Sequence, residues 1–332
     1  MADARVAAVG RRVAPVWRWA RERGLLESGG PVLGLIVLVV FFTVASDFFL
    51  TVRNIFNVLQ QISVLAIVAL GQTLVIITAG IDLSVGSVLA LGGAVAGWTF
   101  AEAGWPMWLA IVAGLGIGAV AGLVNGLLIT LGRLPPFIAT LAMLSAARGF
   151  AQLVTSGEPI SGYPNWFQDV GSYELFNSVP ASVLIVTVLY LLGWFYLRYR
   201  ASGRALYAVG GNEEVARLSG LPNTRLKIQV YTAAGLLSAV AGLVLVARLN
   251  SVQPTAGIGL ELDAIAAVVI GGASLAGGIG SVVATLVGAL IIGVLRNGLN
   301  LLNVSSFWQQ VVIGGVIAGA VLLDTLRKRT RL

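Results

Sequence analysis

Ten apolar stretches run through the chain, separated by short polar or glycine-rich segments. Each is close to the length that crosses the roughly 30 Å hydrocarbon core of a bilayer as an α-helix, about 20 residues. They lie at 31–50, 54–79, 83–100, 106–131, 135–156, 180–197, 228–250, 262–277, 281–300 and 305–324. This pattern predicts an all-α polytopic membrane protein with about ten transmembrane helices.

Two of the gaps between these stretches are rich in glycine and resemble each other. One lies near 80–86 (Gly-Ile-Asp-Leu-Ser-Val-Gly) and the other near 271–280. Inside a membrane, non-helical backbone is tolerated only where it is buried in protein or lines a cavity. Both segments are therefore predicted to be breaks in the helical bundle, and a re-entrant segment in place of a full span remains open at either one.

The distribution of basic residues indicates the orientation. The first 30 residues, Arg133, the polar island 198–227 and the C-terminal tail hold 17 of the 21 lysines and arginines, and an even number of predicted spans separates them. The opposite loops, around Glu102 and from Gly157 to Pro180, contain none. By the positive-inside rule, both termini and the island are predicted to be cytoplasmic.

The chain accordingly divides into three parts. Residues 1–30 form a cytoplasmic or interfacial arm rich in arginine and tryptophan, 31–326 form the transmembrane domain, and 327–332 form a basic cytoplasmic tail.

The polar island contains one short predicted helix, from Glu213 to about Ser219. Asn212 is a suitable N-cap, and Gly220 can end the helix in a left-handed conformation. Acidic residues 213 and 214 occupy the first turn, where the helix dipole favours negative charge.

So short a helix does not persist alone in water, so this one is expected to pack against something. Val215 and Leu218 supply a small apolar face for that packing. Two interpretations remain open, a connector that rests on its own chain and a surface that a soluble partner grips.

Polar side chains inside the apolar stretches are costly unless they find a partner or face water, so they are candidates for a translocation path. The candidates, with one aromatic residue among them, are Gln72, Thr78, Asp82, Ser84, Asn125, Phe137, Arg148, Gln253, Glu261, Asp263, Asn297 and Gln309. Structural roles compete with this one. Asp82 is suited to N-cap the helix after the first break, Arg148 to pair with a carboxylate or with helix-end carbonyls, and Glu261 and Asp263 to be interfacial charges.

Composition excludes several classes of function. Charged residues make up 11% of the chain, hydrophobic ones 58%, and there is no cysteine or histidine. The net charge of +7 follows from loops beside membrane spans, so it indicates contact with membrane lipid and no nucleic acid partner. No phosphate-binding loop, catalytic pair or metal-ligand cluster is visible, which predicts neither an enzyme nor a resident metal or cofactor. ATP hydrolysis would require a separate subunit.

Several motifs carry a family resemblance, in matching order from about Asn54 to Asp324. They are Gly71-Gln-Thr-Leu-Val-Ile-Ile-Thr-Ala-Gly-Ile-Asp-Leu-Ser-Val-Gly-Ser-Val-Leu-Ala90, Asn125-Gly-Leu-Leu, Pro136-Phe-Ile-Ala-Thr-Leu, Gly210-Gly-Asn-Glu-Glu-Val-Ala-Arg-Leu-Ser-Gly-Leu, Gln253-Pro-Thr-Ala-Gly, Glu261-Leu-Asp-Ala-Ile-Ala-Ala-Val-Val-Ile-Gly-Gly and Phe307-Trp-Gln-Gln. In these the chain resembles the permease subunits of bacterial monosaccharide ABC importers, the ribose, xylose, arabinose and galactose group.

The resemblance implies a homodimeric permease in the bacterial cytoplasmic membrane, with ATPase subunits on the cytoplasmic side and an extracytoplasmic sugar-binding protein. It makes 31–326 the permease domain and 198–227 its coupling loop. Together with the charge of the island, it assigns contact with the ATPase to Gly203, Arg204, Gly211, Asn212, Glu213, Glu214, Ala216, Arg217, Ser219 and Gly220.

Two alternatives stay open. One is an ABC permease for nucleosides or another small polar solute. The other is an ion-coupled secondary transporter, in which Asp82, Glu261 or Asp263 would couple to an ion.

Overall fold

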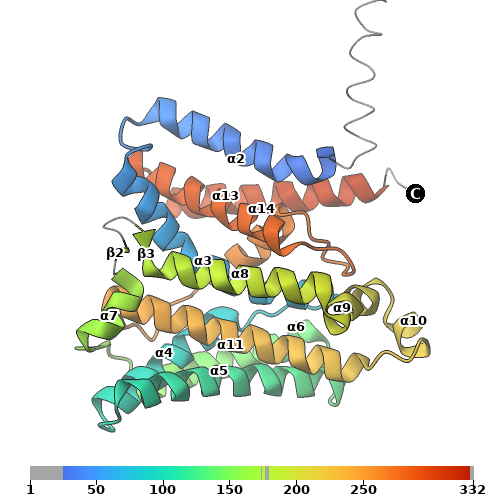
Figure 1. The fold of residues 1–332 in the computed structure, drawn as a ribbon, viewed down its shortest axis with the longest axis horizontal. Helices are drawn as coiled ribbons and strands as arrows, with labels where there is room; N and C mark the ends of the chain where they lie inside the picture. Colours follow the sequence, from blue (N-terminus) through green and yellow to red (C-terminus); the bar gives the residue numbers. More distant parts are fainter. Residues whose placement is uncertain (1–24, 173, 176–178, 330–332) are drawn as a thin grey trace, which may run out of the picture.

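The chain is almost entirely helical. The structure is a computed structural model that describes residues 25–172, 174–175 and 179–329. Within these residues it forms thirteen helices and two antiparallel pairs of two-residue strands (Figure 1). The all-α polytopic class is therefore confirmed, with the strand pairs as a small addition. Residues 1–24 of the predicted N-terminal arm and 330–332 of the predicted tail lie outside the described residues.

The helices follow the apolar stretches closely, and one helix overlaps each of the ten. The elements are α2 Leu25–Ala45, α3 Val52–Ile77, α4 Val85–Ala101, α5 Met107–Thr130, α6 Pro136–Thr155, β1 Ile160–Ser161, α7 Asn165–Ser172, β2 Glu174–Leu175, β3 Val179–Pro180, α8 Ala181–Tyr199, α9 Ala201–Gly211, α10 Glu213–Leu218, α11 Asn223–Leu249, β4 Ser251–Val252, α12 Leu260–Ile270, α13 Val282–Leu301 and α14 Ser306–Arg329. The sequence had not predicted α7 or α9.

Helix length separates full spans from partial ones. Six helices are long and apolar enough to cross a membrane, namely α3, α5, α6, α8, α11 and α13. The Gly29–Ala45 part of α2 and the whole of α4 are shorter apolar segments. Helix α12 has 11 residues, a length of about 16 Å, which is too short to cross alone. The stretch 262–277 thus does not form the full span predicted for it, because the helix ends at Ile270 and the chain unwinds through 271–281.

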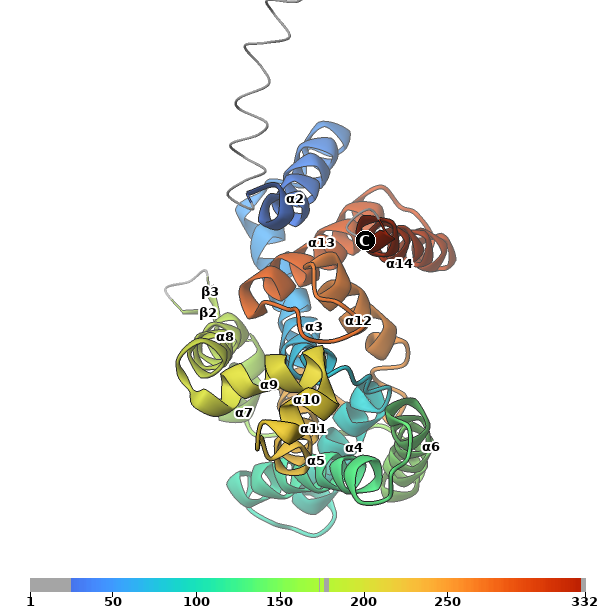
Figure 2. The ribbon, with the colours of Figure 1, turned by 90° about the vertical axis from the view of Figure 1, so that its right-hand side faces the viewer.

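Helix α3 is the centre of the bundle. It contacts α8, α9, α11, α12 and α13, and 89% of its most apolar window is buried. Figure 2, which looks onto the end that carries α10, shows α3 enclosed by these helices while α2, α5, α6 and α14 lie at the periphery. The outer helices α5, α6 and α8 are far less buried, as expected for surfaces that face lipid.

Small residues allow the inner helices to approach closely. A Cβ atom added at Gly118 of α5 would lie 2.7 Å from the carbonyl oxygen of Gly235 on α11. Such small-residue contacts are typical of helix packing in membranes. There an apolar side chain gains little by contacting another helix instead of lipid, so close packing stabilises the bundle.

The two glycine-rich breaks meet inside the bundle. The first runs from residue 78 to 84, between α3 and α4, and the second from 271 to 281, between α12 and α13. The amide of Gly278 in the second break donates to the carbonyl of Ile77 at the end of α3, at 2.9 Å. Backbone groups that leave the helices therefore find partners in each other, as the apolar surroundings require.

Candidate functional site

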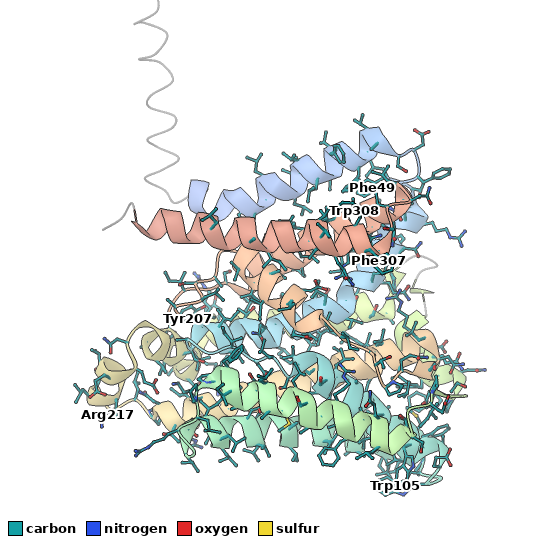
Figure 3. The ribbon with its side chains drawn as sticks, turned by 180° about the vertical axis from the view of Figure 1, so that it is seen from behind. Phe49, Trp105, Tyr207, Arg217, Phe307 and Trp308 are labelled. Atoms are coloured by element: carbon teal, nitrogen blue, oxygen red, sulfur yellow. The ribbon has the colours of Figure 1, made fainter. Side chains whose placement is uncertain are left out.

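The polar island folds as two helices. Helix α8 ends at Tyr199, α9 follows at Ala201–Gly211, and α10 covers Glu213–Leu218, close to the one helix that was predicted. Figure 3 shows Arg217 at one end of the molecule and Trp105 at the other, so α10 projects from one end of the bundle.

The caps of α10 are those expected from the sequence. The side-chain oxygen of Asn212 accepts from the amide of Val215 at 3.0 Å. Gly220 has a φ of 80° and ends the segment in the left-handed region. The hydroxyl of Ser219 donates to the carbonyl of Val215 at 2.8 Å.

Helix α10 is held to its own chain by polar contacts. Glu213 pairs with Lys227 on α11 at 2.6 Å, and the side-chain amide of Asn223 donates to the carbonyl of Glu213 at 2.7 Å. Ala216 is buried at 3% exposure. These contacts hold so short a helix in place without a large apolar face.

The apolar face of α10 points outward. Val215 is 56% exposed and Leu218 is 76% exposed, so these side chains do not pack against the chain itself. Val215 and Leu218 therefore do not hold α10 to the chain; the polar contacts of Glu213 do, and both the connector and the partner surface stay open as interpretations. The helix presents a bare apolar face, as a surface that another protein covers would do.

Charged residues flank this face. Glu214 and Arg217 form an ion pair, with side chains 63% and 66% exposed. The hydrogen bond from Arg217, followed by its charge, lowers the pKa of Glu214, so this carboxylate stays ionised at neutral pH. The outer surface of α10 thus combines an apolar centre with fixed charges of both signs.

Helix α9 lies tightly against the end of α8. A Cβ atom at Gly203 would overlap the carbonyl oxygen of Tyr196, so only glycine fits there. Arg204 donates to the carbonyl of Tyr199 at 3.0 Å. Gly211, by contrast, has open space around its Cα.

The other end of α9 contacts the end of α3 and the second break. A Cβ atom at Gly210 would overlap the carbonyl oxygen of Ile77 and lie 2.7 Å from the amide nitrogen of Gly278. The hydroxyl of Tyr207 donates to the carbonyl of Gly280 at 3.0 Å. We call these three contacts, which Gly210 and Tyr207 make with the last residue of α3 and with the second break, the α9 junction; no sequence pattern had indicated it.

The first break is surrounded by polar groups from several helices. Asn125 on α5 donates to the Ser84 hydroxyl at 3.0 Å, and that hydroxyl donates to the Asp82 carboxylate at 2.6 Å. The Gln72 amide on α3, in the orientation that satisfies both its atoms, bonds the backbone amide and carbonyl of Asp82. Thr78 donates to the last turn of α3.

These groups hold the break in shape. Gln72, Thr78, Asp82, Ser84 and Asn125 are all 2% exposed or less. The N-cap position of α4 belongs to Ser84 and not to Asp82, since the helix begins at Val85. Asp82 accepts from the amide of Ser84 at 2.8 Å, so it supports the helix start from two residues before the N-cap.

A pair of substitutions at Asp82 tests this structural role. Asp82→Asn keeps an acceptor for the Ser84 amide and is expected to change the melting temperature little. Asp82→Leu leaves buried donors without a partner, which costs roughly 1–3 kcal/mol, so this variant is expected to have a clearly lower melting temperature. Thermal unfolding of the purified permease measures both. An equal fall in melting temperature in the two variants would show that the negative charge of Asp82 itself is needed.

A second group of candidates lies around the loop between α11 and α12. Arg148 on α6 donates to the carbonyls of Pro254 and Ala256 at 2.8 and 2.7 Å. It thus binds backbone carbonyls, but these belong to a loop and not to a helix end as expected. Gln253 donates to the Ser251 hydroxyl at 3.0 Å, and Glu261 accepts from the amide of Gly259. Strand β4 of the same loop pairs with β1, which follows α6.

Two further candidates join helices within the bundle. Asp263 on α12 forms an ion pair with Arg296 on α13 and is buried at 6%, so it is not an ordinary interfacial charge. Asn297 exchanges two hydrogen bonds of 2.9 Å with Asn54 on α3. The sequence had not indicated Asn54 as a partner, because residues 243 positions apart meet only in the folded chain.

The remaining candidates differ in exposure. Gln309 on α14 is buried and donates to the side chain of Asn300. Phe137 on α6 is 51% exposed. The twelve candidates thus form separate groups, at the first break, at the loop between α11 and α12 and between helices, and a path role for any of them stays a prediction. Within the described residues no group of three or more acidic side chains is placed to hold a metal ion.

Comparison with known proteins agrees with the motifs. Residues 54–321 match a family model described as the permease component of the branched-chain amino acid transport system. The chain is 48% identical to the ribose import permease protein RbsC of Escherichia coli K12, over 94% of this chain and 97% of that protein. It is 48% identical to RbsC of Bacillus subtilis, over 91% of this chain and 94% of that protein.

Relatives named for other sugars align over similar lengths. The fructose import permease protein FrcC of Rhizobium meliloti is 39% identical over 90% of this chain and 86% of its own length. The xylose transport system permease protein XylH of Escherichia coli K12 is 35% identical over 90% of this chain and 91% of its own length. With its apolar helices and this extent of similarity, the chain belongs to the family of multi-pass bacterial inner-membrane permeases of ABC importers that includes the ribose, xylose and fructose permeases, and it is a transport protein and not an enzyme.

Proposed function

We propose that the protein is the translocation subunit of an ATP-driven importer for a monosaccharide, delivered by an extracytoplasmic binding protein. The observation that carries the proposal is α10, a capped helix that projects from one end of the bundle with Val215 and Leu218 bare. An ATPase subunit is the partner we assign to this surface, over residues 203–220.

The proposed topology has ten membrane-embedded helices and both termini in the cytoplasm. Its support is the excess of lysine and arginine in segments that lie on the side of α10. Helix α12 enters the membrane only partway before the second break, as expected of a discontinuous helix in a transporter. Residues 31–326 are then the permease domain and 198–227 its coupling loop.

The α9 junction supports a direct mechanical role for this loop. Gly210 contacts Ile77, the last residue of α3 before the first break, and both Gly210 and Tyr207 contact the second break. A displacement of α9 by an ATPase would therefore act directly on the end of α3 and on the second break, which joins α12 to α13. Packed contacts of this kind transmit small shifts instead of absorbing them.

A second copy of the chain is proposed to complete the pore. In Figure 2, α12 lies between α14 and α6. The side chain of Arg296, which pairs with α12, is 46% exposed, and Arg296 lies about 8 Å from the end of α13. A charge at that depth is expected to face protein or water and not lipid. The face formed by α6, α12 and α14 is thus assigned to the dimer, with the pore between the copies.

Single cysteines test this dimer, because the chain has none of its own. Phe137→Cys on α6 is expected to give a disulfide-linked dimer on mild oxidation in membranes. Leu191→Cys, which is equally accessible on α8 at 59% exposed, is expected to stay monomeric and serves as the matched control. Dimers from the α8 position alone would place the second copy on a different face.

The cargo is proposed to be a monosaccharide, since the relatives aligned over most of their length are named for ribose, xylose and fructose. ATP hydrolysis by the permease, reconstituted with its ATPase and binding protein, tests this assignment. One pentose or hexose is expected to stimulate hydrolysis only when the binding protein is present. Stimulation by a nucleoside, or by leucine as the family description suggests, would overturn the assignment to sugars.

A further inference from the structure

A groove of about 570 Å³ lies beside α10, at the start of α11. Its walls come from the end of α10, the turn that follows it, and the first two turns of α11. The groove is separate from the outward apolar face formed by Val215 and Leu218, neither of which lines it.

One wall of the groove is polar and positively charged. Arg225, Thr224 and Gln229 are exposed there, and none of their side chains makes a hydrogen bond or ion pair within the described part of the chain. Arg217 also lines the groove and uses only its Nε and one Nη atom on Glu214. The carboxylate of Glu213 is engaged by Lys227. The groove therefore presents guanidinium groups whose charge the nearest carboxylates only partly balance, which suits an anion.

The other wall is apolar. Leu221 and Ile228 are half-buried and line the groove, and Ile228 begins the apolar stretch that continues along α11. In the proposed topology, the groove lies at the level where α11 would pass from polar surroundings into hydrocarbon. A ligand that fits both walls has an anionic head and an apolar tail.

We infer that this groove binds an anionic phospholipid of the cytoplasmic leaflet, with its phosphate between Arg225 and Arg217 and an acyl chain along Ile228. The inference rests on the orientation proposed above, in which α10 is cytoplasmic. Basic grooves at the cytoplasmic ends of transmembrane helices attract anionic headgroups, because that leaflet carries negative charge.

The site has a consequence for coupling. Arg217 belongs to α10 and Arg225 to α11, so one phosphate between them links the two helices. This link adds to the existing contacts of Glu213 with Lys227 and Asn223. Bound anionic lipid is therefore expected to stabilise the contact of α10 with α11, and so the position of α10 to which an ATPase would bind.

Native mass spectrometry of the detergent-purified permease, after addition of phosphatidylglycerol or phosphatidylcholine, tests the site without ATPase or transport. The wild-type protein is expected to retain phosphatidylglycerol in preference to phosphatidylcholine. Arg225→Gln is expected to reduce that retention about tenfold, the effect of losing roughly 1.4 kcal/mol of charge-assisted contact. Arg225→Lys should retain most of it.

Arg133→Gln is the matched control, since Arg133 is an exposed arginine of the α5–α6 loop, outside the groove and on the same side in the proposed topology. Equal retention of phosphatidylglycerol by the wild type and Arg225→Gln, or equal retention of both lipids by the wild type, would overturn the site. So would a photo-crosslinker at Thr224 that captures only the ATPase in the assembled complex. Lipid retention is measured on the permease alone, so its result does not depend on the importer assignment. That assignment is tested separately, by ATP-driven transport of the assembled complex.

Discussion

Replacing Gly210 with alanine is expected to abolish most sugar-stimulated ATP hydrolysis, although alanine favours a helix over glycine by about 1 kcal/mol. The added methyl group would overlap the carbonyl oxygen of Ile77 and crowd the amide of Gly278. Both of these atoms belong to backbone, which cannot move aside as a flexible side chain can. The α9 junction must therefore open, and we expect a loss of tenfold or more, since overpacking costs roughly 1–3 kcal/mol.

The matched control is Gly116→Ala on α5, where an added Cβ atom meets nothing within 4 Å. This variant gains the same helix propensity without a clash and is expected to hydrolyse ATP as the wild type does. Tyr207→Phe removes only the hydrogen bond to Gly280 and should be milder than Gly210→Ala. Wild-type stimulation in Gly210→Ala would show that the junction plays no part in coupling.

Replacing Leu218 with aspartate is expected to prevent assembly with the ATPase while the permease stays folded. Leu218 is 76% exposed on α10, so the substitution removes little contact within the chain. In the complex, however, it would place an unpaired charge in a buried apolar contact. Central apolar contacts of an interface contribute about 2 kcal/mol or more, so we expect at least about thirtyfold weaker binding of the ATPase.

Co-purification of the ATPase with the tagged permease measures this assembly, and the melting temperature of the permease alone reports its folding. Ile258→Asp, at 71% exposure on the loop before α12, is the control for adding a charge to an exposed apolar position. It should leave ATPase binding unchanged. Undiminished binding by Leu218→Asp would place the ATPase contact elsewhere.

Local features of the fold were predictable because their causes are local. Each of the ten apolar stretches is overlapped by one helix, since the cost of exposing backbone in lipid leaves little choice. Asn212 caps α10 and Gly220 ends its segment, as those residue types do in many helices. The breaks were also visible, although α12 proved shorter than its apolar stretch because Gly271 and Gly272 end it early.

Features that depend on distant partners were not predictable. From the sequence, Val215 and Leu218 were predicted to pack α10 against a neighbour. In the structure, polar contacts of Glu213 hold α10, and the two apolar side chains are exposed. Arg148 was compatible with a carboxylate or with carbonyls, and only the fold brings Pro254 to it. Polarity alone marks a group as needing a partner but does not say whether that partner is protein or a passing solute.

The burial of the polar groups at the first break separates two kinds of intramembrane residue. Asp82 and Asn125 support non-helical backbone in this conformation. Glu261 and Phe137 are more accessible and lie on elements of the proposed dimer face. A path between two copies would therefore be lined by accessible residues such as Glu261 and Phe137. The buried groups, such as Asp82 and Asn125, would determine whether the breaks can change conformation.

The most direct test of the account is sugar uptake into liposomes that contain the permease, its ATPase and its binding protein. With ATP supplied on the ATPase side and ion gradients collapsed by ionophores, we predict full uptake, and none when ATP is omitted. Uptake that stops when the gradients collapse, or that proceeds without ATP and ATPase, would contradict the assignment of this chain as an ATP-driven permease subunit.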